Sequence, residues 1–190
     1  MAQEIDSTFY QNKQLRSVGL KDSKGKQGEW RFYYPNGSKN SIEQYKDGQM
    51  QGKVTNFDPS GKTVSIENWL HGLPHDSAFY YYENGQLKRK GVYKEGTYEG
   101  LWKYYFDNGS LERVGNYKNG LPHGEWINYN EQGFLIEKGN YDQGKQQGFF
   151  QFFDDKGRLM YEGNYDKGKE IGEWYMITKK GKKKLYEDYK

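Results

Sequence analysis

The chain has 190 residues, of which 33% are hydrophobic and 29% are charged, and its formal net charge is +3. So polar a composition would by itself suggest disorder, but 18% of the residues are aromatic, and each such side chain can bury about 150–250 Å². The sequence therefore predicts a folded chain with an aromatic core. A small net charge with 26 interleaved acidic residues argues against a nucleic-acid-binding surface.

Several other classes of protein are disfavoured at this stage. The chain has no cysteine, which excludes disulfides and thiolate metal sites. No apolar stretch is long enough to predict a membrane span, and no apolar segment typical of a signal peptide follows the first residues. The compartment stays open: cytoplasmic if the given N-terminus is native, periplasmic or cell envelope if a signal peptide was removed.

Glycine and aromatic residues recur every 24 residues, in what we call columns. One column is glycine in every unit: Gly37, Gly61, Gly85, Gly109, Gly133, Gly157 and Gly181. A second column is mainly tryptophan: Trp30, Val54, Ala78, Trp102, Trp126, Phe150 and Trp174. A third is mainly tyrosine: Tyr45, Trp69, Tyr93, Tyr117, Tyr141, Tyr165 and Tyr189. A fixed period of this length indicates stacked structural repeats.

Each repeat has the pattern of a β-hairpin. In residues 100–123, a short aromatic run at 101–106 is followed by Asp107-Asn108-Gly109 and then by a second run at 111–118. We expect the Asn-Gly dipeptide to supply the positive φ angles of a tight hairpin turn. Residues 119–122 then turn the chain into the next repeat.

A single hairpin of this size is not stable alone in water, so neighbouring hairpins must pair. The sequence predicts an all-β fold, an elongated single twisted antiparallel sheet of tandem 24-residue hairpins. Residues 1–27 are expected to form a partial repeat that caps the start. Residues 28–171 hold six repeats, beginning at 28, 52, 76, 100, 124 and 148, and residues 172–190 hold the last. Five lysines at 179–184 are either a polar cap for the final edge strand or a binding patch.

The motif Gly115-x-Tyr117-x-x-Gly120-x-x-x-Gly124 resembles the membrane-occupation-and-recognition-nexus (MORN) repeat. Trp126 stands where the standard repeat has another glycine, and together with the 24-residue period it makes the chain similar to the bacterial variant of that repeat. The resemblance covers residues 28–189. It implies a scaffold, a dimerisation module or a lipid binder. For the bacterial variant it implies an antitoxin or immunity protein that neutralises a toxin.

No constellation of residues predicts catalysis. His75 and His123 occupy one column two repeats apart, about 20 Å in a stacked sheet, and His71 shares a turn with His75. Zinc prefers three or four ligands, so turn formation explains these histidines better than metal binding. Nucleophile motifs, phosphate loops and paired carboxylates are not evident. We therefore expect no enzyme activity, no catalytic residue, no cofactor and no metal.

The candidate partner-binding residues lie in two columns that vary between repeats. Clustered tyrosine with arginine is typical of interface hot spots. The candidates are Phe32, Tyr34, Tyr80, Tyr82, Tyr104 and Phe106, flanked by Arg89 and Arg113. Strand alternation places these aromatic residues on the same face as the tryptophan column. The alternative reading is therefore that they only build the core.

Two classes of function remain. The leading one is a non-catalytic protein-binding scaffold, of the antitoxin or immunity type, that occludes a toxin encoded nearby. The alternative is an envelope-associated or periplasmic scaffold, or a lipid-surface binder acting through lysines 179–184, without a toxin partner. A homodimer formed through the ends of the sheet stays open. Nucleic acid ranks last among the partners.

Overall fold

The computed structural model describes residues 2–190, and within them every regular element is a β-strand. The chain divides into two compact units, residues 1–97 and 98–190, which are described separately. No helix in the described part is long and apolar enough to cross a membrane.

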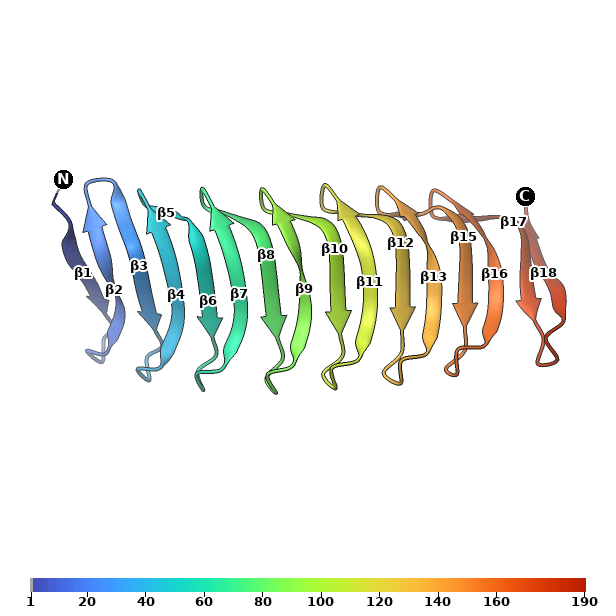
Figure 1. Ribbon diagram of the computed structural model, residues 1–190, viewed down its shortest axis with the longest axis horizontal. Helices are drawn as coiled ribbons and strands as arrows, with labels where there is room; N and C mark the ends of the chain where they lie inside the picture. Colours follow the sequence, from blue (N-terminus) through green and yellow to red (C-terminus); the bar gives the residue numbers. More distant parts are fainter. Residues whose placement is uncertain (1) are drawn as a thin grey trace. The chain divides into compact units, whose positions relative to one another are not determined.

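In the first unit, all paired strands are antiparallel (Figure 1). The strands are β1 (Glu4–Phe9), β2 (Leu15–Asp22), β3 (Gly25–Tyr33), β4 (Lys39–Lys46), β5 (Gln49–Met50), β6 (Gly52–Phe57), β7 (Thr63–Leu70), β8 (Leu73–Tyr81) and β9 (Leu87–Lys94). The short strand β5 and the longer β6 both pair with β4.

The second unit repeats this organisation. Its strands are β10 (Thr97–Tyr105), β11 (Leu111–Lys118), β12 (Leu121–Tyr129), β13 (Leu135–Asp142), β14 (Lys145–Gln146), β15 (Gly148–Phe153), β16 (Leu159–Asp166), β17 (Lys169–Ile177) and β18 (Lys183–Tyr189). Both β14 and β15 pair with β13. The prediction of an all-β fold of tandem antiparallel hairpins is confirmed.

The loops that contain the invariant glycine differ in detail from the expectation. Gly109 has a φ of 87°, whereas Asn108 is not among the residues with positive φ. The amide of Phe106 donates to the carbonyl of Ser110 at 2.9 Å, and the Asn108 side-chain oxygen accepts from the Ser110 amide at 2.8 Å. This is a turn closed by one left-handed glycine, a G1 bulge. The expectation that asparagine also adopts positive φ here is wrong, because its role is that of a hydrogen-bond acceptor.

A different turn, a two-residue turn of type I′, lies at the other end of each hairpin. Asn119 and Gly120 both have positive φ, 52° and 80°, between the paired residues Lys118 and Leu121. This is the two-residue turn that matches the twist of antiparallel strands. His71, with a φ of 51°, occupies the same place in the first unit, so it is a turn residue.

In each unit the core lies on one face of the sheet, which we call the aromatic face. Its most buried members are Trp30, Val54 and Ala78 in the first unit and Trp102, Trp126, Phe150 and Trp174 in the second. Trp126 pairs with Gly115 across β11 and β12, and a Cβ built on Gly115 would lie 2.1 Å from the indole ring. The ring therefore rests directly on the glycine backbone. Gly139 under Phe150 and Gly163 under Trp174 repeat this contact, which gives one glycine column its physical reason.

Candidate partner-binding face

A row of side chains crosses the strands of the second unit on the aromatic face. Each member pairs in register with the next, so neighbours are about 5 Å apart. The row is Tyr104, Arg113, Asn128, Glu137, Phe152 and Tyr161. These positions vary between repeats while the tryptophan and tyrosine columns persist, and they give this unit its individual surface.

The corresponding row of the first unit is built largely from small polar residues. It is Thr8, Ser17, Phe32, Ser41, Asn56, Ser65, Tyr80 and Arg89. Its hydroxyl groups bond along the row: Thr8 to Ser17 at 2.7 Å, and the Asn56 amide to Ser65 at 2.8 Å. Ser17, Ser41 and Ser65 are buried, and each of their hydroxyl groups has a hydrogen-bond partner within the chain.

Two tyrosines of these rows lie beneath arginines, one in each unit. The Arg89 guanidinium carbon lies 4.1 Å from the Tyr80 ring centre, and that of Arg113 lies 4.2 Å from the ring of Tyr104. The Tyr104 hydroxyl also lies 3.0 Å from that of Tyr117. Burial is the main cause that raises the pKa of Tyr104 and of Tyr80, so both phenols stay protonated at neutral pH.

The exposed member of the second-unit stack is the arginine. Tyr104 is only 7% exposed, whereas Arg113 is exposed and has no carboxylate partner within residues 2–190. A guanidinium held flat on a ring keeps its donors available at low entropic cost. Tyr104 therefore supports the guanidinium, and Arg113 is the exposed member of the pair.

Asn128, which stands opposite Arg113 in the row, was not among the sequence candidates. Its side-chain oxygen is buried, and no group in the described part of the chain donates to it. A buried acceptor without a donor costs about 1–3 kcal/mol. The only sequence signal was a polar residue in a column that is aromatic at Phe32, Tyr80 and Tyr104.

Three further candidates lie where the hairpins end. The strands end at Tyr33, Tyr81 and Tyr105, so Tyr34, Tyr82 and Phe106 begin the glycine loops. The Tyr34 hydroxyl donates to the carbonyl of Phe57 at 2.9 Å, a bond that joins one hairpin to the next. The structure thus separates these residues from the middle of the row.

Phe32 lies in the row but far from the other first-unit candidates. Four strand spacings separate it from Tyr80, about 19 Å. Its immediate neighbours are Trp30, with ring centres 6.1 Å apart, and the ammonium of Lys26. The sequence candidates of this unit therefore form two separate groups.

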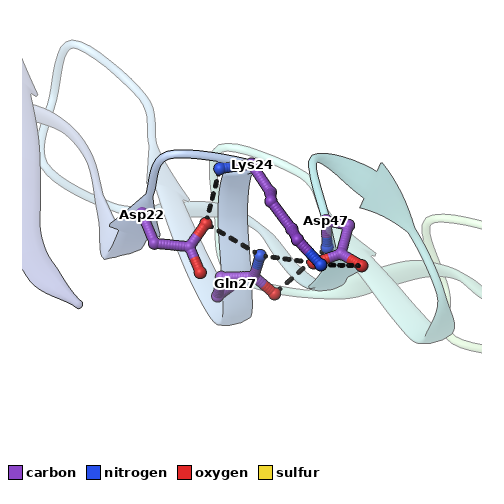
Figure 2. A network of polar contacts seen from close by, with 4 residues as sticks. All are labelled: Asp22, Lys24, Gln27 and Asp47. Carbon is purple, nitrogen blue, oxygen red and sulfur yellow. Dashed lines mark hydrogen bonds and ion pairs between the residues drawn. The ribbon is translucent and has the colours of Figure 1, made fainter. Parts of the chain in front are cut away.

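These two-residue turns are held by side chains that precede them in the sequence. Gln27 is buried and donates to Asp22 at 3.1 Å and Asp47 at 3.0 Å, while its oxygen accepts from the Asp47 amide at 3.1 Å (Figure 2). Lys24 adds an ion pair with Asp47 at 3.6 Å. The backbone amide of Asp47, the turn residue with positive φ, thus donates to the side chain of Gln27.

Two histidines belong to this same column of turn-holding residues. His75 Nδ1 accepts from the Glu95 amide at 3.5 Å, and His123 Nδ1 lies 3.2 Å from a carboxylate oxygen of Asp142. Across residues 2–190, no group of three or more histidine, aspartate or glutamate side chains has the arrangement of a metal site. Contacts with these turns therefore explain why both histidines occur at this position of the repeat.

Comparisons with known proteins identify the repeat. The family model described as "MORN repeat variant" matches residues 26–47, 77–95 and 98–119. None of the curated proteins compared matches the sequence significantly. Similar solved structures include the crystal structures of TcdB2-TccC3-Cdc42, at 13% identity and a TM-score of 0.21, and of TcdB2-TccC3, at 14% and 0.20. Each match covers 92% of this chain but 13% of the other, and similarity this low carries no argument about function.

Proposed function

We propose that this chain, three stretches of which match the MORN repeat variant, is a non-catalytic scaffold that binds a protein partner through its aromatic face. The observation that carries this proposal is the pair formed by Arg113 and Asn128. One is an exposed cation with unused donors, and the other is a buried acceptor without a donor.

A partner can satisfy the exposed group directly. A carboxylate can take two donors from the planar guanidinium of Arg113, and a donor beside it reaches the buried oxygen of Asn128 once the side chains that cover that oxygen move aside. Arginine and tyrosine are enriched among residues that dominate binding energy, and the Tyr104 ring already fixes the guanidinium at 4.2 Å. We therefore propose that the partner presents an acidic side chain beside a hydrogen-bond donor.

The finer form of the proposal is an antitoxin or immunity protein whose partner is a toxin encoded nearby. It rests on the resemblance of these repeats to the bacterial variant of the family. Occlusion requires a stable complex of fixed stoichiometry and needs no catalytic group on this chain. The test is co-expression with the products of the neighbouring genes, followed by size-exclusion chromatography and a growth assay.

Arg113→Ala tests the surface itself. We expect this variant to bind the partner about tenfold or more weakly with an unchanged melting temperature, because the side chain is exposed. The matched control is Lys103→Ala, which removes a cation from the opposite face of the adjacent strand, where Lys103 pairs with Val114. Equal binding by wild type and both variants would refute this surface. Failure of every neighbouring gene product to form a complex would refute the antitoxin form.

The lysine-rich end supports a second candidate, binding to an anionic lipid surface. Lys179, Lys180, Lys182 and Lys184 are exposed, whereas Lys183 pairs with Glu162 at 2.8 Å. Surface lysines each contribute about 1 kcal/mol near an anionic membrane, and salt screens that attraction. Flotation with phosphatidylserine vesicles at low and high salt tests this candidate, and a protein that never floats rules it out.

A further inference from the structure

In the first unit, three aromatic rings surround one lysine ammonium. The Lys26 nitrogen lies 4.6 Å from the ring centre of Trp30, 4.5 Å from that of Phe32 and 4.6 Å from that of Tyr45. We call these three rings the cage. Rings at this distance attract a cation through their negative faces.

The walls of the cage are fixed by the sheet. Trp30 and Phe32 are two residues apart on β3, and Tyr45 stands on the paired strand β4. The Trp30 indole is 1% exposed and donates to the carbonyl of Leu20 at 2.8 Å. These contacts hold the rings whether or not a cation lies between them.

The carboxylate of Glu43 completes the site behind Tyr45. It accepts from the Tyr45 hydroxyl at 2.5 Å and from Ser41 at 2.7 Å. Burial, followed by this bond to Glu43, raises the pKa of Tyr45. The phenol therefore stays protonated, and a negative charge lies close to the cage.

A primary ammonium is poorly matched to this environment. It has three N–H donors, and the one acceptor that the described residues offer Lys26 is the Tyr45 oxygen, at 3.5 Å. Burial lowers the pKa of Lys26, although Glu43 opposes the shift. A quaternary ammonium has no N–H group to satisfy and keeps its charge, which is why aromatic cages bind such groups.

The second unit fills the equivalent position differently. Tyr98 occupies the position in its repeat that Lys26 occupies in the first unit. The Tyr98 ring stacks on Tyr117 with ring centres 4.9 Å apart, and its centre lies 4.3 Å from that of Trp102. That ring is part of the core. Lys26 instead reaches its cage on a flexible four-carbon stem, which can withdraw into solvent without moving the strands.

We propose that Trp30, Phe32 and Tyr45 form a binding site for small molecules that carry a quaternary ammonium group, and that Lys26 is its tethered occupant. A tethered group competes at an effective concentration of about millimolar. An external ligand must displace Lys26, so this side chain sets the concentration at which the site fills. This site is separate from the row that contains Arg113.

The test is titration of the folded protein with choline, followed through the indole N–H resonance of Trp30. We expect Lys26→Ala to bind choline at least about tenfold more tightly than the wild type. The matched control Lys26→Ala with Phe32→Leu keeps an apolar side chain but removes one ring face, and its choline binding should fall back at least about tenfold. The uncharged isostere 3,3-dimethylbutan-1-ol should bind neither variant detectably.

Three results would overturn the proposal: no choline binding by folded Lys26→Ala, equal binding of the uncharged isostere, or equal affinity with and without the Phe32 ring. Free trimethyllysine should bind as choline does, because the two share the ammonium group. If the protein bound phosphatidylcholine vesicles but not free choline, it would recognise the membrane surface and not the ammonium group, and the proposed site would be refuted. If Lys26→Ala does not fold, the wild type at high choline decides, since the Cε resonance of Lys26 must move as it leaves the cage.

Discussion

Replacing Gly115 by alanine tests whether the ring-on-glycine contact holds the hairpins together. The new Cβ would lie 2.1 Å from the nearest ring atom of Trp126, against about 3.5–4.0 Å for an ordinary carbon contact. The indole must therefore move by about 1.5 Å. That movement breaks its bond to the Asn116 carbonyl at 3.1 Å and disturbs its edge contacts with Tyr117 and Tyr141.

We expect Gly115→Ala to lower the free energy of unfolding by about 2–4 kcal/mol. Overpacking contributes about 1–3 kcal/mol, and the lost hydrogen bond contributes about 1 kcal/mol. The assay is urea unfolding followed by tryptophan fluorescence. Gly124→Ala is the control for backbone strain, because it has a φ of 75° and no atom within 4 Å of its Cβ. It should lose only about 1–2 kcal/mol.

A double-mutant cycle separates the clash from any effect on the strand itself. Trp126→Val removes the ring, and Gly115 does not have positive φ. In that background Gly115→Ala should be neutral or slightly stabilising, by about 0.4–1 kcal/mol, because alanine restricts the unfolded chain. An equal loss from Gly115→Ala with and without the ring would refute the reasoning.

Three smaller predictions concern the turns and the bulges. Gln27→Leu leaves the Asp47 amide without its side-chain acceptor and should cost about 1–3 kcal/mol in urea unfolding. Hydrogen bonds from Ser60 and from the Lys62 amide lower the pKa of Asp58. The ionised Asp58 carboxylate therefore stabilises the fold fully at pH values above the ordinary aspartate pKa of about 3.9, and this stabilisation is lost as the pH falls through the lowered pKa. Asp58→Asn should therefore flatten the acid limb of the stability curve, and an unchanged limb would contradict this. Asp76 holds a φ of 68°, so Asp76→Gly should raise stability by up to about 1 kcal/mol, and a lower melting point would argue against strain there.

The fold was predictable from the sequence because its physical requirements repeat. Every 24 residues a ring needs a glycine or small residue beneath it and a hairpin needs its left-handed glycine, so periodicity alone locates the strands. The turn types were harder. Asn108-Gly109 and Asn119-Gly120 have the same letters, yet only Asn119 adopts positive φ. The difference lies in loop length and strand pairing, which a dipeptide does not encode.

The candidate site was less predictable, because its decisive features are relations between residues. Tyr and Arg in adjacent columns indicated a recognition surface. Whether the ring or the guanidinium is presented depends on which covers the other, and the stack of Arg113 on Tyr104 decides it. Lys26 carried no signal, since a lysine near aromatic residues is common and only the distances to three rings distinguish it. Asn128 stands out only once its oxygen is seen to be buried without a donor.

One substitution pattern links the fold to recognition. In the second unit, glycines lie beneath large rings, as Gly115 does beneath Trp126. In the first unit Glu67 stands in the glycine column, and it pairs with Ala78 where most other repeats have a ring. A carboxylate cannot lie beneath an indole, so the two positions have to change together. The exchange replaces a ring and a glycine of the aromatic core by a buried alanine and a half-buried carboxylate, and the two residues still pair across the strands. Repeats of this kind can therefore vary their aromatic face while the sheet persists, because the backbone ladder holds the hairpins in register wherever the rings are absent.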